Sequence, residues 1–340
     1  MKIAILVPNF VEFDGSARVA EVQAEELARE GNDVAVFTFA AGIRPENVEV
    51  FVMGMPRSLF LERVYRLLFP LDLFKALKWL PRLKGFDEII VHLYPLTWLA
   101  WLAKKRYGAK YTFWYHGIMD PQFFPRLYER VYIRLQILMT RLTVSNADRA
   151  VGVSRAGVNE LKRYTGLDGE VVYNKVDLGK FHPGVDGTKV REEYRLGEAP
   201  VVLFVGALRP VKGVHLLVES FNIVKQRIPD ARLVVVGQAD YPYYYERVKH
   251  IGDDAVVFAG FVSHESLPFY YAACDVYASC SRWEAHNLPV LEAQACGKPV
   301  VTFDIESFRE EVGDAGTLVE VGNVQQFAEA CVERLNQERS

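Results

Sequence analysis

Two glutamates, Glu284 and Glu292, stand with seven residues between them in a stretch that could bind hydroxyl and phosphate groups together. Between them, Leu288-Pro289 opens a run of good helix formers that Gly297 closes, which predicts one short helix. Glu284 then lies in the loop before this helix, and Glu292 lies about one turn inside it.

The amides at the start of this predicted helix add a second chemistry. The N–H groups of His286, Asn287 and Leu288 lack acceptors inside the helix and favour an anion. Carboxylates repel phosphate, so their natural partners are hydroxyl groups. A ligand with phosphates between two polyhydroxyl groups is a nucleotide sugar. The alternative is a helix with an acidic first turn, which adds only about 0.3–1 kcal/mol of stability.

The stretch from Ser281 to Val301 resembles the S-x-x-E-G-F-G-L-P-V-L-E-A-x-A-C-G-x-P-V-V signature of family 4 glycosyltransferases, a retaining group with the GT-B fold. The resemblance implies that Glu292 binds the ribose and Glu284 the hydroxyls of the sugar. This chain has Ala285-His286-Asn287 where the family has Gly-Phe-Gly, a departure that bears on which sugar is bound.

A second stretch, Gly206-Ala207-Leu208-Arg209-Pro210-Val211-Lys212-Gly213, follows a predicted strand, Val201 to Gly206, and precedes a helix from about Val214. It resembles the family's G-R-L-x-x-x-K-G. The resemblance assigns Arg209 and Lys212 to the diphosphate and to the charge left when the sugar departs. It assigns Gly206 and Gly213 to close backbone approach. The alternative is two exposed cations on a turn.

Weaker matches complete the predicted donor site. In the family, backbone groups of the turn Gly260-Phe261-Val262 pair with the base, which assigns Phe261 and Val262 to donor binding. Near the N-terminus, Gly15-Ser16 stands where the family has Gly-Gly, between a strand and a helix, and is predicted to approach the donor phosphate or the acceptor. An ordinary strand–helix turn explains this loop equally well. No G-x-G-x-x-G appears, which disfavours a dinucleotide cofactor.

Two histidines, His92 and His116, end the predicted strands Glu88 to Leu93 and Lys110 to Tyr115. Ligands bind at this edge of open α/β sheets. His116-Gly117 matches the family's strand-end H-G, which implies a hydrogen bond from His116 to the transferred sugar. For His92 a structural and a functional role remain equally open.

The composition is that of a globular protein, and its charge is uneven. Half of the residues are hydrophobic and the net charge is −3. Residues 1–150 carry 20 Lys+Arg against 16 Asp+Glu, whereas residues 151–340 carry 20 against 27. A basic first half suits a phosphate-bearing or membrane-surface partner, and no nucleic-acid motif is present. The four cysteines show no metal spacing and predict buried free thiols in the reducing cytoplasm.

Two basic, aromatic-rich segments, Arg57 to Lys84 and Phe123 to Arg141, resemble helices that lie on anionic membranes. Packing helices with basic outer faces are the alternative, which we favour for the second segment. For residues 57–84 we expect peripheral contact with the inner face of the cell membrane. No apolar run is long enough to span it.

The alternation of strands and helices predicts an α/β protein with two doubly wound parallel sheets, a GT-B pair of Rossmann-like domains facing across a cleft. We place an acceptor-side domain at 1–182 and a nucleotide-sugar-binding domain at 183–340. The resemblance implies a UDP-, GDP- or ADP-sugar donor, a glycan or lipid-linked acceptor, no cofactor and no obligatory metal. It also implies a C-terminal helix that crosses back to the first domain. A nucleotide-sugar 2-epimerase and a non-catalytic binding subunit remain alternatives.

Overall fold

The computed structural model describes residues 1–12, 14–56, 58–124, 126–239, 241–313 and 316–338. The chain divides into two compact units, Met1–Tyr173 (unit 1) and Asn174–Ser340 (unit 2). Residues 174–182, which the sequence placed in the first domain, thus belong to unit 2. Arg57, the predicted start of the first basic segment, lies outside the described residues.

Unit 1 is built on a parallel sheet with strand order β5-β3-β1-β6-β7-β8-β9. The order reverses between β1 and β6, as in a doubly wound fold. A short β2–β4 pair lies beside it. The strands are β1 (Lys2–Leu6), β2 (Asn9–Phe10), β3 (Asp33–Thr38), β4 (Ala40–Ala41), β5 (Glu49–Val52), β6 (Glu88–His92), β7 (Lys110–Tyr115), β8 (Arg149–Gly152) and β9 (Glu170–Val171).

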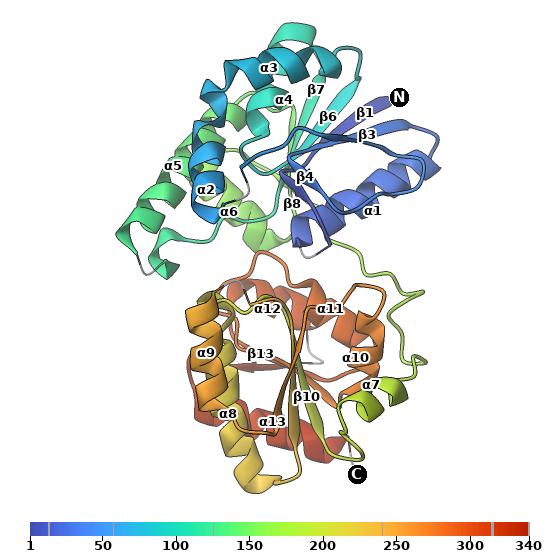
Figure 1. The fold of residues 1–340 in the computed structure, drawn as a ribbon, viewed down its shortest axis with the longest axis vertical. Coiled ribbons are helices and arrows are strands. Elements are labelled where there is room, and N and C mark those ends of the chain that lie inside the picture. Colours follow the sequence, from blue (N-terminus) through green and yellow to red (C-terminus); the bar gives the residue numbers. More distant parts are fainter. Residues whose placement is uncertain (13, 57, 125, 240, 314–315, 339–340) are drawn as a thin grey trace. The chain divides into compact units, whose positions relative to one another are not determined.

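Helices cover both faces of this sheet because its strands are apolar on both sides. One face of the sheet packs against the alanines of α1. The other face packs on a core that includes α4, α5, α6 and the segment around Trp79. Figure 1 shows α1 apart from this second group. The helices are α1 (Gly15–Arg29), α2 (Leu59–Leu68), η1 (Phe69–Leu71), α3 (Leu73–Trp79), η2 (Leu80–Leu83), α4 (Thr97–Tyr107), η3 (Pro121–Phe123), α5 (Leu127–Val144) and α6 (Arg155–Thr165).

Unit 2 repeats the architecture with strand order β12-β11-β10-β13-β14-β15, all parallel. The order reverses between β10 and β13. The two-sheet prediction is therefore confirmed. The strands are β10 (Val201–Val205), β11 (Arg232–Val236), β12 (Val256–Gly260), β13 (Val276–Ser279), β14 (Val300–Phe303) and β15 (Thr317–Val319).

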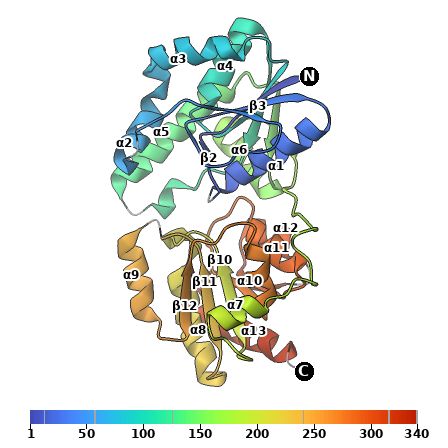
Figure 2. The same cartoon turned by 45° about the vertical axis from the view of Figure 1, so that its right-hand side comes forward.

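In unit 2, α8 and α13 pack side by side on one face of the sheet, and α10, α11 and α12 pack on the other (Figures 1 and 2). All four cysteines are free and buried in these layers, as the sequence predicted. The helices are α7 (Thr188–Glu193), η4 (Pro210–Lys212), α8 (Val214–Arg227), α9 (Pro242–Ile251), α10 (Leu267–Ala273), α11 (Leu288–Ala295), α12 (Glu306–Val312) and α13 (Val324–Gln337).

Candidate functional site

The candidate site of unit 2 lies where the strand order reverses, at the carboxyl ends of β10 and β13. These strands are hydrogen-bonded neighbours, with Val202 opposite Val276. The loop after β10 therefore lies beside the loop after β13. Such a reversal point is where open α/β sheets bind ligands. The first loop carries Lys212 and the second carries Glu284, so the sheet brings together two residues that are far apart in the sequence.

Lys212 and Glu284 form an ion pair at this point. Lys212 Nζ lies 2.6 and 2.8 Å from the two Glu284 carboxylate oxygens, and the Asn287 side-chain amide donates to Glu284 Oε1 at 2.9 Å. The Glu284 side chain is 6% exposed and that of Lys212 is 25% exposed. Glu284 is therefore held by two donors, and the Lys212 ammonium remains the more accessible partner.

Arg282 ties the two loops together. Its backbone N–H donates to Val211 O at 2.9 Å, and its guanidinium donates to Pro210 O at 3.0 Å. Both acceptors lie in η4, just before Lys212. The position of Lys212 relative to Glu284 is thus set by backbone contacts as well as by the ion pair. Sequence reasoning gave Arg282 no role.

Gly213 is required where the two loops meet. Its φ of 64° lies in the left-handed region, and a Cβ there would come within 2.0 Å of Cys280 O. Gly206, at the end of β10, has a φ of 157°, and its own carbonyl would meet a Cβ placed on Gly237 at 1.9 Å. At both glycines, therefore, two segments of the protein backbone lie close together: Gly213 lies against Cys280, and Gly206 lies against Gly237.

Helix α11 begins at Leu288, as predicted, and two amides at its start, those of Asn287 and Val290, have acceptors within the chain. The Asn287 side chain caps the helix by accepting from Val290 N at 3.2 Å. The Asn287 N–H, predicted to face an anion, donates to Glu311 Oε1 at 2.9 Å. Glu311 thus enters the site from α12, which follows β14, the strand beside β13. The sequence did not predict a site role for Glu311.

Glu311 accepts from a backbone amide, whereas Glu284 is paired with a lysine. It is buried, and burial raises its pKa to about 8, with Glu284 and Glu310 acting in the same direction. The Asn287 N–H and Lys212 act in the opposite direction. Its Oε2 atom has no hydrogen-bond partner within the part of the chain that the structure describes.

Glu292 lies inside α11, as predicted, and is 1% exposed. Its Oε2 accepts from the Tyr271 hydroxyl at 2.7 Å, and His264 Nε2 lies 3.7 Å from its Oε1. Both partners come from residues around α10, which packs beside α11. The ribose role predicted for Glu292 therefore involves a carboxylate that tyrosine already orients.

His286, which stands where the family has an aromatic residue, is neutral. Burial lowers its pKa to about 4, against the opposing effect of Glu310. Its Nδ1 lies 3.1 Å from the Asn174 side-chain amide, which can only donate, so the ring proton is on Nε2. Asn174 is the first residue of unit 2, a position that the sequence did not connect with the site.

The remaining predicted donor residues of unit 2 lie on neighbouring loops. Arg209 is exposed and directly precedes η4, on the same loop as Lys212. Phe261 and Val262 follow β12, and Phe261 is 49% exposed. The Gly260 carbonyl beside them accepts from Gly237 N at 2.7 Å. The sheet therefore places the predicted base-binding turn two strands away from β10.

In unit 1, His116 is joined to His92 across neighbouring strand ends. His92 Nδ1 lies 2.6 Å from His116 Nε2, and His92 Nε2 lies 3.0 Å from Gln23 Oε1. Because Gln23 Oε1 accepts, His92 carries its proton on Nε2, and His116 Nε2–H donates to His92 Nδ1. His92 is fully buried, and burial together with His116 lowers its pKa well below the usual value. His92 therefore orients the ring of His116 by accepting its Nε2–H.

The Gly15-Ser16 loop forms the first turn of α1. Asp14 caps this helix: its Oδ1 accepts from Ser16 N at 2.9 Å, Ser16 Oγ at 2.6 Å and Ala17 N at 3.4 Å. A Cβ on Gly15 would meet no atom within 4 Å. The Ser16 and Ala17 amides thus have an acceptor in the chain. That Gly15 and Ser16 bind the nucleotide-sugar donor stays a prediction.

Comparison with known families matches both units. The description "Glycosyltransferase Family 4" matches residues 13–180, and "Glycosyl transferases group 1" matches residues 199–337. A GDP-mannose-dependent alpha-(1-6)-phosphatidylinositol monomannoside mannosyltransferase of Mycolicibacterium smegmatis is 34% identical over 46% of this chain and 44% of its own length. The lipopolysaccharide core biosynthesis mannosyltransferase LpsB of Rhizobium meliloti is 28% identical over 62% and 64%. The chain thus spans less than two thirds of these relatives.

Solved structures share the fold over the whole chain. A sucrose-phosphate synthase from Thermosynechococcus elongatus superposes with a TM-score of 0.83 at 20% identity, over 99% of this chain and 90% of that one. HepE of Anabaena, in complex with UDP and glucose, gives 0.81 at 22% identity, over 99% and 91%. The two family matches and this fold together show that the chain belongs to the family 4, group 1 glycosyltransferases and has the GT-B fold.

Proposed function

We propose that this protein is a retaining glycosyltransferase that moves a sugar from a nucleoside-diphosphate donor to an acceptor hydroxyl. The Lys212–Glu284 pair beside the start of α11 carries the proposal, because it joins a cation, a carboxylate and helix amides at the reversal point of one sheet. The cation and the helix amides can bind a diphosphate, and the carboxylate can accept from sugar hydroxyls.

In this proposal, Lys212 and Arg209 stabilise the negative charge that grows on the diphosphate as the sugar departs. Glu284, held by Lys212 and Asn287, accepts from hydroxyls of the transferred sugar. Glu292, oriented by Tyr271, accepts from the ribose, and the turn at Phe261-Val262 binds the base. His116, oriented by His92, binds the transferred sugar. Retention and front-face attack, with the leaving phosphate taking the acceptor's proton, follow from the family resemblance.

A surface on unit 1 supports a lipid-linked acceptor. We call it the apolar–basic surface; it comprises the exposed side chains of α2 to η2 and of α5. Leu71, Leu73, Phe74 and Leu77 are 66–78% exposed, and Leu127 is 74% exposed. Although we favoured core packing for the second segment, α5 exposes further large apolar side chains: Tyr128, Val131, Leu135, Leu138 and Leu142.

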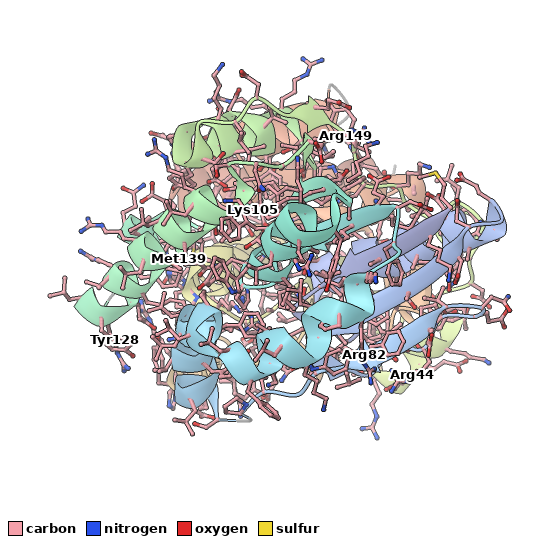
Figure 3. The ribbon with its side chains drawn as sticks, turned by 90° about the horizontal axis from the view of Figure 1, so that it is seen from above. Arg44, Arg82, Lys105, Tyr128, Met139 and Arg149 are labelled. Atoms are coloured by element: carbon pink, nitrogen blue, oxygen red, sulfur yellow. The ribbon has the colours of Figure 1, made fainter. Side chains whose placement is uncertain are left out.

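Basic side chains border these apolar ones. Lys78, Arg82 and Lys84 are exposed in the first stretch, and Arg134 and Arg141 are exposed on α5. An ion pair between Arg63 and Glu129 links α2 to α5, and Figure 3 shows the two stretches, with Arg82 labelled on the first and Tyr128 on the second. Apolar groups with cations around them suit an anionic lipid surface. No described helix has the length and apolar character needed to cross a membrane.

The lipid partner is tested by co-sedimentation with phosphatidylcholine vesicles with and without phosphatidylglycerol. We expect binding that requires the anionic lipid and is lost in Phe74→Ser/Leu77→Ser. Val22→Ser/Val52→Ser, on exposed sites elsewhere in unit 1, is the control. Equal binding by both double variants, or none by the wild type, would refute this acceptor class.

The donor is tested by thermal stabilisation with UDP, GDP and ADP, each with and without EDTA, because a ligand of the folded state raises the melting temperature. Metal dependence is thereby tested directly. GDP-mannose and UDP-glucose are the first sugars to try, since the relatives' names include the former and HepE was solved with UDP-glucose. Transfer is then followed by NMR of the product anomer. Conversion of the donor without an acceptor would instead identify a 2-epimerase, and binding without turnover a non-catalytic subunit.

A further inference from the structure

The carboxyl group of Glu311 is the feature of unit 2 that the proposed donor site leaves unused. Glu311 is 9% exposed, and it comes from α12, whose preceding strand β14 pairs with β13. Its Oε1 accepts the Asn287 N–H at the start of α11. Its Oε2, in the same carboxyl group beside the same helix start, is buried without a partner among the described residues.

Capping alone does not account for this arrangement. The Asn287 N–H needs one acceptor, which Oε1 provides. The second oxygen still carries the cost of removing a polar atom from water. A buried polar atom of this kind beside the first turn of a helix suits an incoming ligand group. The ligand that the rest of this site suits is a diphosphate.

The charges around Glu311 decide which form of the carboxyl group is present. Glu284 and Glu310 add to the effect of burial and raise its pKa to about 8, while Lys212 opposes them. Tyr277, whose own pKa Glu311 helps to raise, stays neutral through this range. At neutral pH Glu311 is therefore protonated. Because Oε1 accepts from Asn287, the proton is on Oε2.

We infer that Glu311 is a further donor-binding residue, and that its Oε2–H donates a hydrogen bond to the diphosphate of the nucleotide sugar at the start of α11. The inference rests on the proposed function. A protonated acid offers a donor without the charge that repels phosphate, whereas an ionised one offers only repulsion. Glu311 therefore makes donor binding depend on pH, and a site with cations alone would lack this dependence.

Titration calorimetry with UDP-glucose, GDP-mannose and ADP-glucose between about pH 6.5 and about pH 9 tests this inference. Glu311→Gln keeps an acceptor for Asn287 and a donor for phosphate, and it cannot ionise. Glu311→Met removes both groups. Glu306→Gln, an exposed change on the same helix, is the matched control. Melting temperatures of all variants establish that each is folded.

For the wild type and Glu306→Gln we expect donor affinity to fall above about pH 8, approaching tenfold per pH unit. Glu311→Gln should match the wild type at neutral pH and should not share this loss. Glu311→Met should bind roughly three- to tenfold more weakly at neutral pH, the effect of one lost hydrogen bond. Ionisation of the ligand is common to all variants and cancels in the comparison.

Two failures are distinguishable. If the wild type binds a nucleotide sugar and Glu311→Gln shows the same decline above pH 8, Glu311 does not contact the diphosphate, while the proposed function stands. If Glu311→Met binds as tightly as the wild type at neutral pH, the inference fails in the same way. If the wild type binds none of the three nucleotide sugars at any pH, the proposed function and this inference fall together.

Discussion

Lys212 Nζ lies within 2.8 Å of both carboxylate oxygens of Glu284, and this bidentate pair joins the loops that follow β10 and β13. Glu284 is nearly buried, so its charge depends on Lys212 and on the Asn287 amide. When one member of such a pair is removed, the other charge is left without compensation. Loss of either side chain is therefore expected to destabilise the fold, whatever role the pair has in sugar transfer.

We expect Lys212→Met to lower the free energy of unfolding by about 1–3 kcal/mol, below the range for fully buried pairs because Lys212 is partly exposed. Adding Glu284→Gln should restore part of the loss, since the orphaned charge is then gone. Denaturant unfolding of both single variants and the double variant measures this coupling. Additive losses would show that the two side chains do not stabilise each other.

The same lysine should matter more for the rate of transfer than for binding. Charge on the diphosphate grows as the sugar departs, so an ammonium group stabilises the transition state more than the bound donor. Lys212→Ala should lower kcat by about 10²-fold or more, with a smaller change in the donor Kd. Lys225→Ala, in a surface ion pair of α8, is the control. Equal losses in kcat and affinity would remove the transition-state role.

Glu292 is expected to bind ribose through a carboxylate that Tyr271 orients. Glu292→Gln keeps the shape of the side chain but weakens its acceptance of hydroxyl donors, so nucleoside diphosphate affinity should fall by about tenfold. Tyr271→Phe should cause a smaller fall, because it removes the orienting hydrogen bond at Oε2 but keeps the carboxylate. Calorimetry with the free diphosphate measures both. Unchanged affinity in Glu292→Gln would refute the ribose role.

His92 should act on transfer only through His116. His92→Phe fits the buried, aromatic position beside Trp114 but removes the acceptor for His116 Nε2–H. Transfer should slow by about tenfold, while nucleoside diphosphate affinity stays the same, since unit 2 is unaltered. Gln23→Glu, which preserves an acceptor for His92 Nε2–H, should retain most of the rate. A rate unchanged in His92→Phe would leave the histidine pair a packing feature.

The sequence predicted those features that short-range signals and the sheet order determine. Leu288-Pro289 marked the start of α11, and parallel pairing of β10 with β13 follows from a doubly wound fold, so the meeting of Lys212 and Glu284 was predictable. The helix cap at Asp14 had a signal as well, because Asp is a preferred residue at a helix start. Asp14 accepts from the Ser16 and Ala17 amides, whereas the prediction for this loop was based on Gly15.

Glu311 and Asn174 could not be found in this way. Glu311 reaches Asn287 because β14, the strand before α12, lies beside β13. No spacing in the sequence indicates that a carboxyl group of α12 points toward the start of α11. Asn174 reaches His286 over more than a hundred residues. Tyr244 lies on α9, and its hydroxyl accepts from His215 N, a contact between residues that are also distant in the sequence. Tertiary contacts decided all three.

Glu311 should also make the stability of the protein depend on pH. Its pKa is about 8 in the folded chain and near 4.5 in the unfolded chain, so between these values the folded state binds the extra proton. Stability from this group is therefore present below about pH 4.5 and is lost as pH rises toward about 8, by up to about 1.4 kcal/mol per pH unit. In Glu311→Gln this loss should vanish. Melting temperatures of the two proteins without nucleotide should thus diverge from pH 5 to pH 8, with the variant the more stable at the upper end. Parallel curves would mean that Glu311 is ionised throughout, and its oxygen could then accept from a hydroxyl but could not donate to a phosphate.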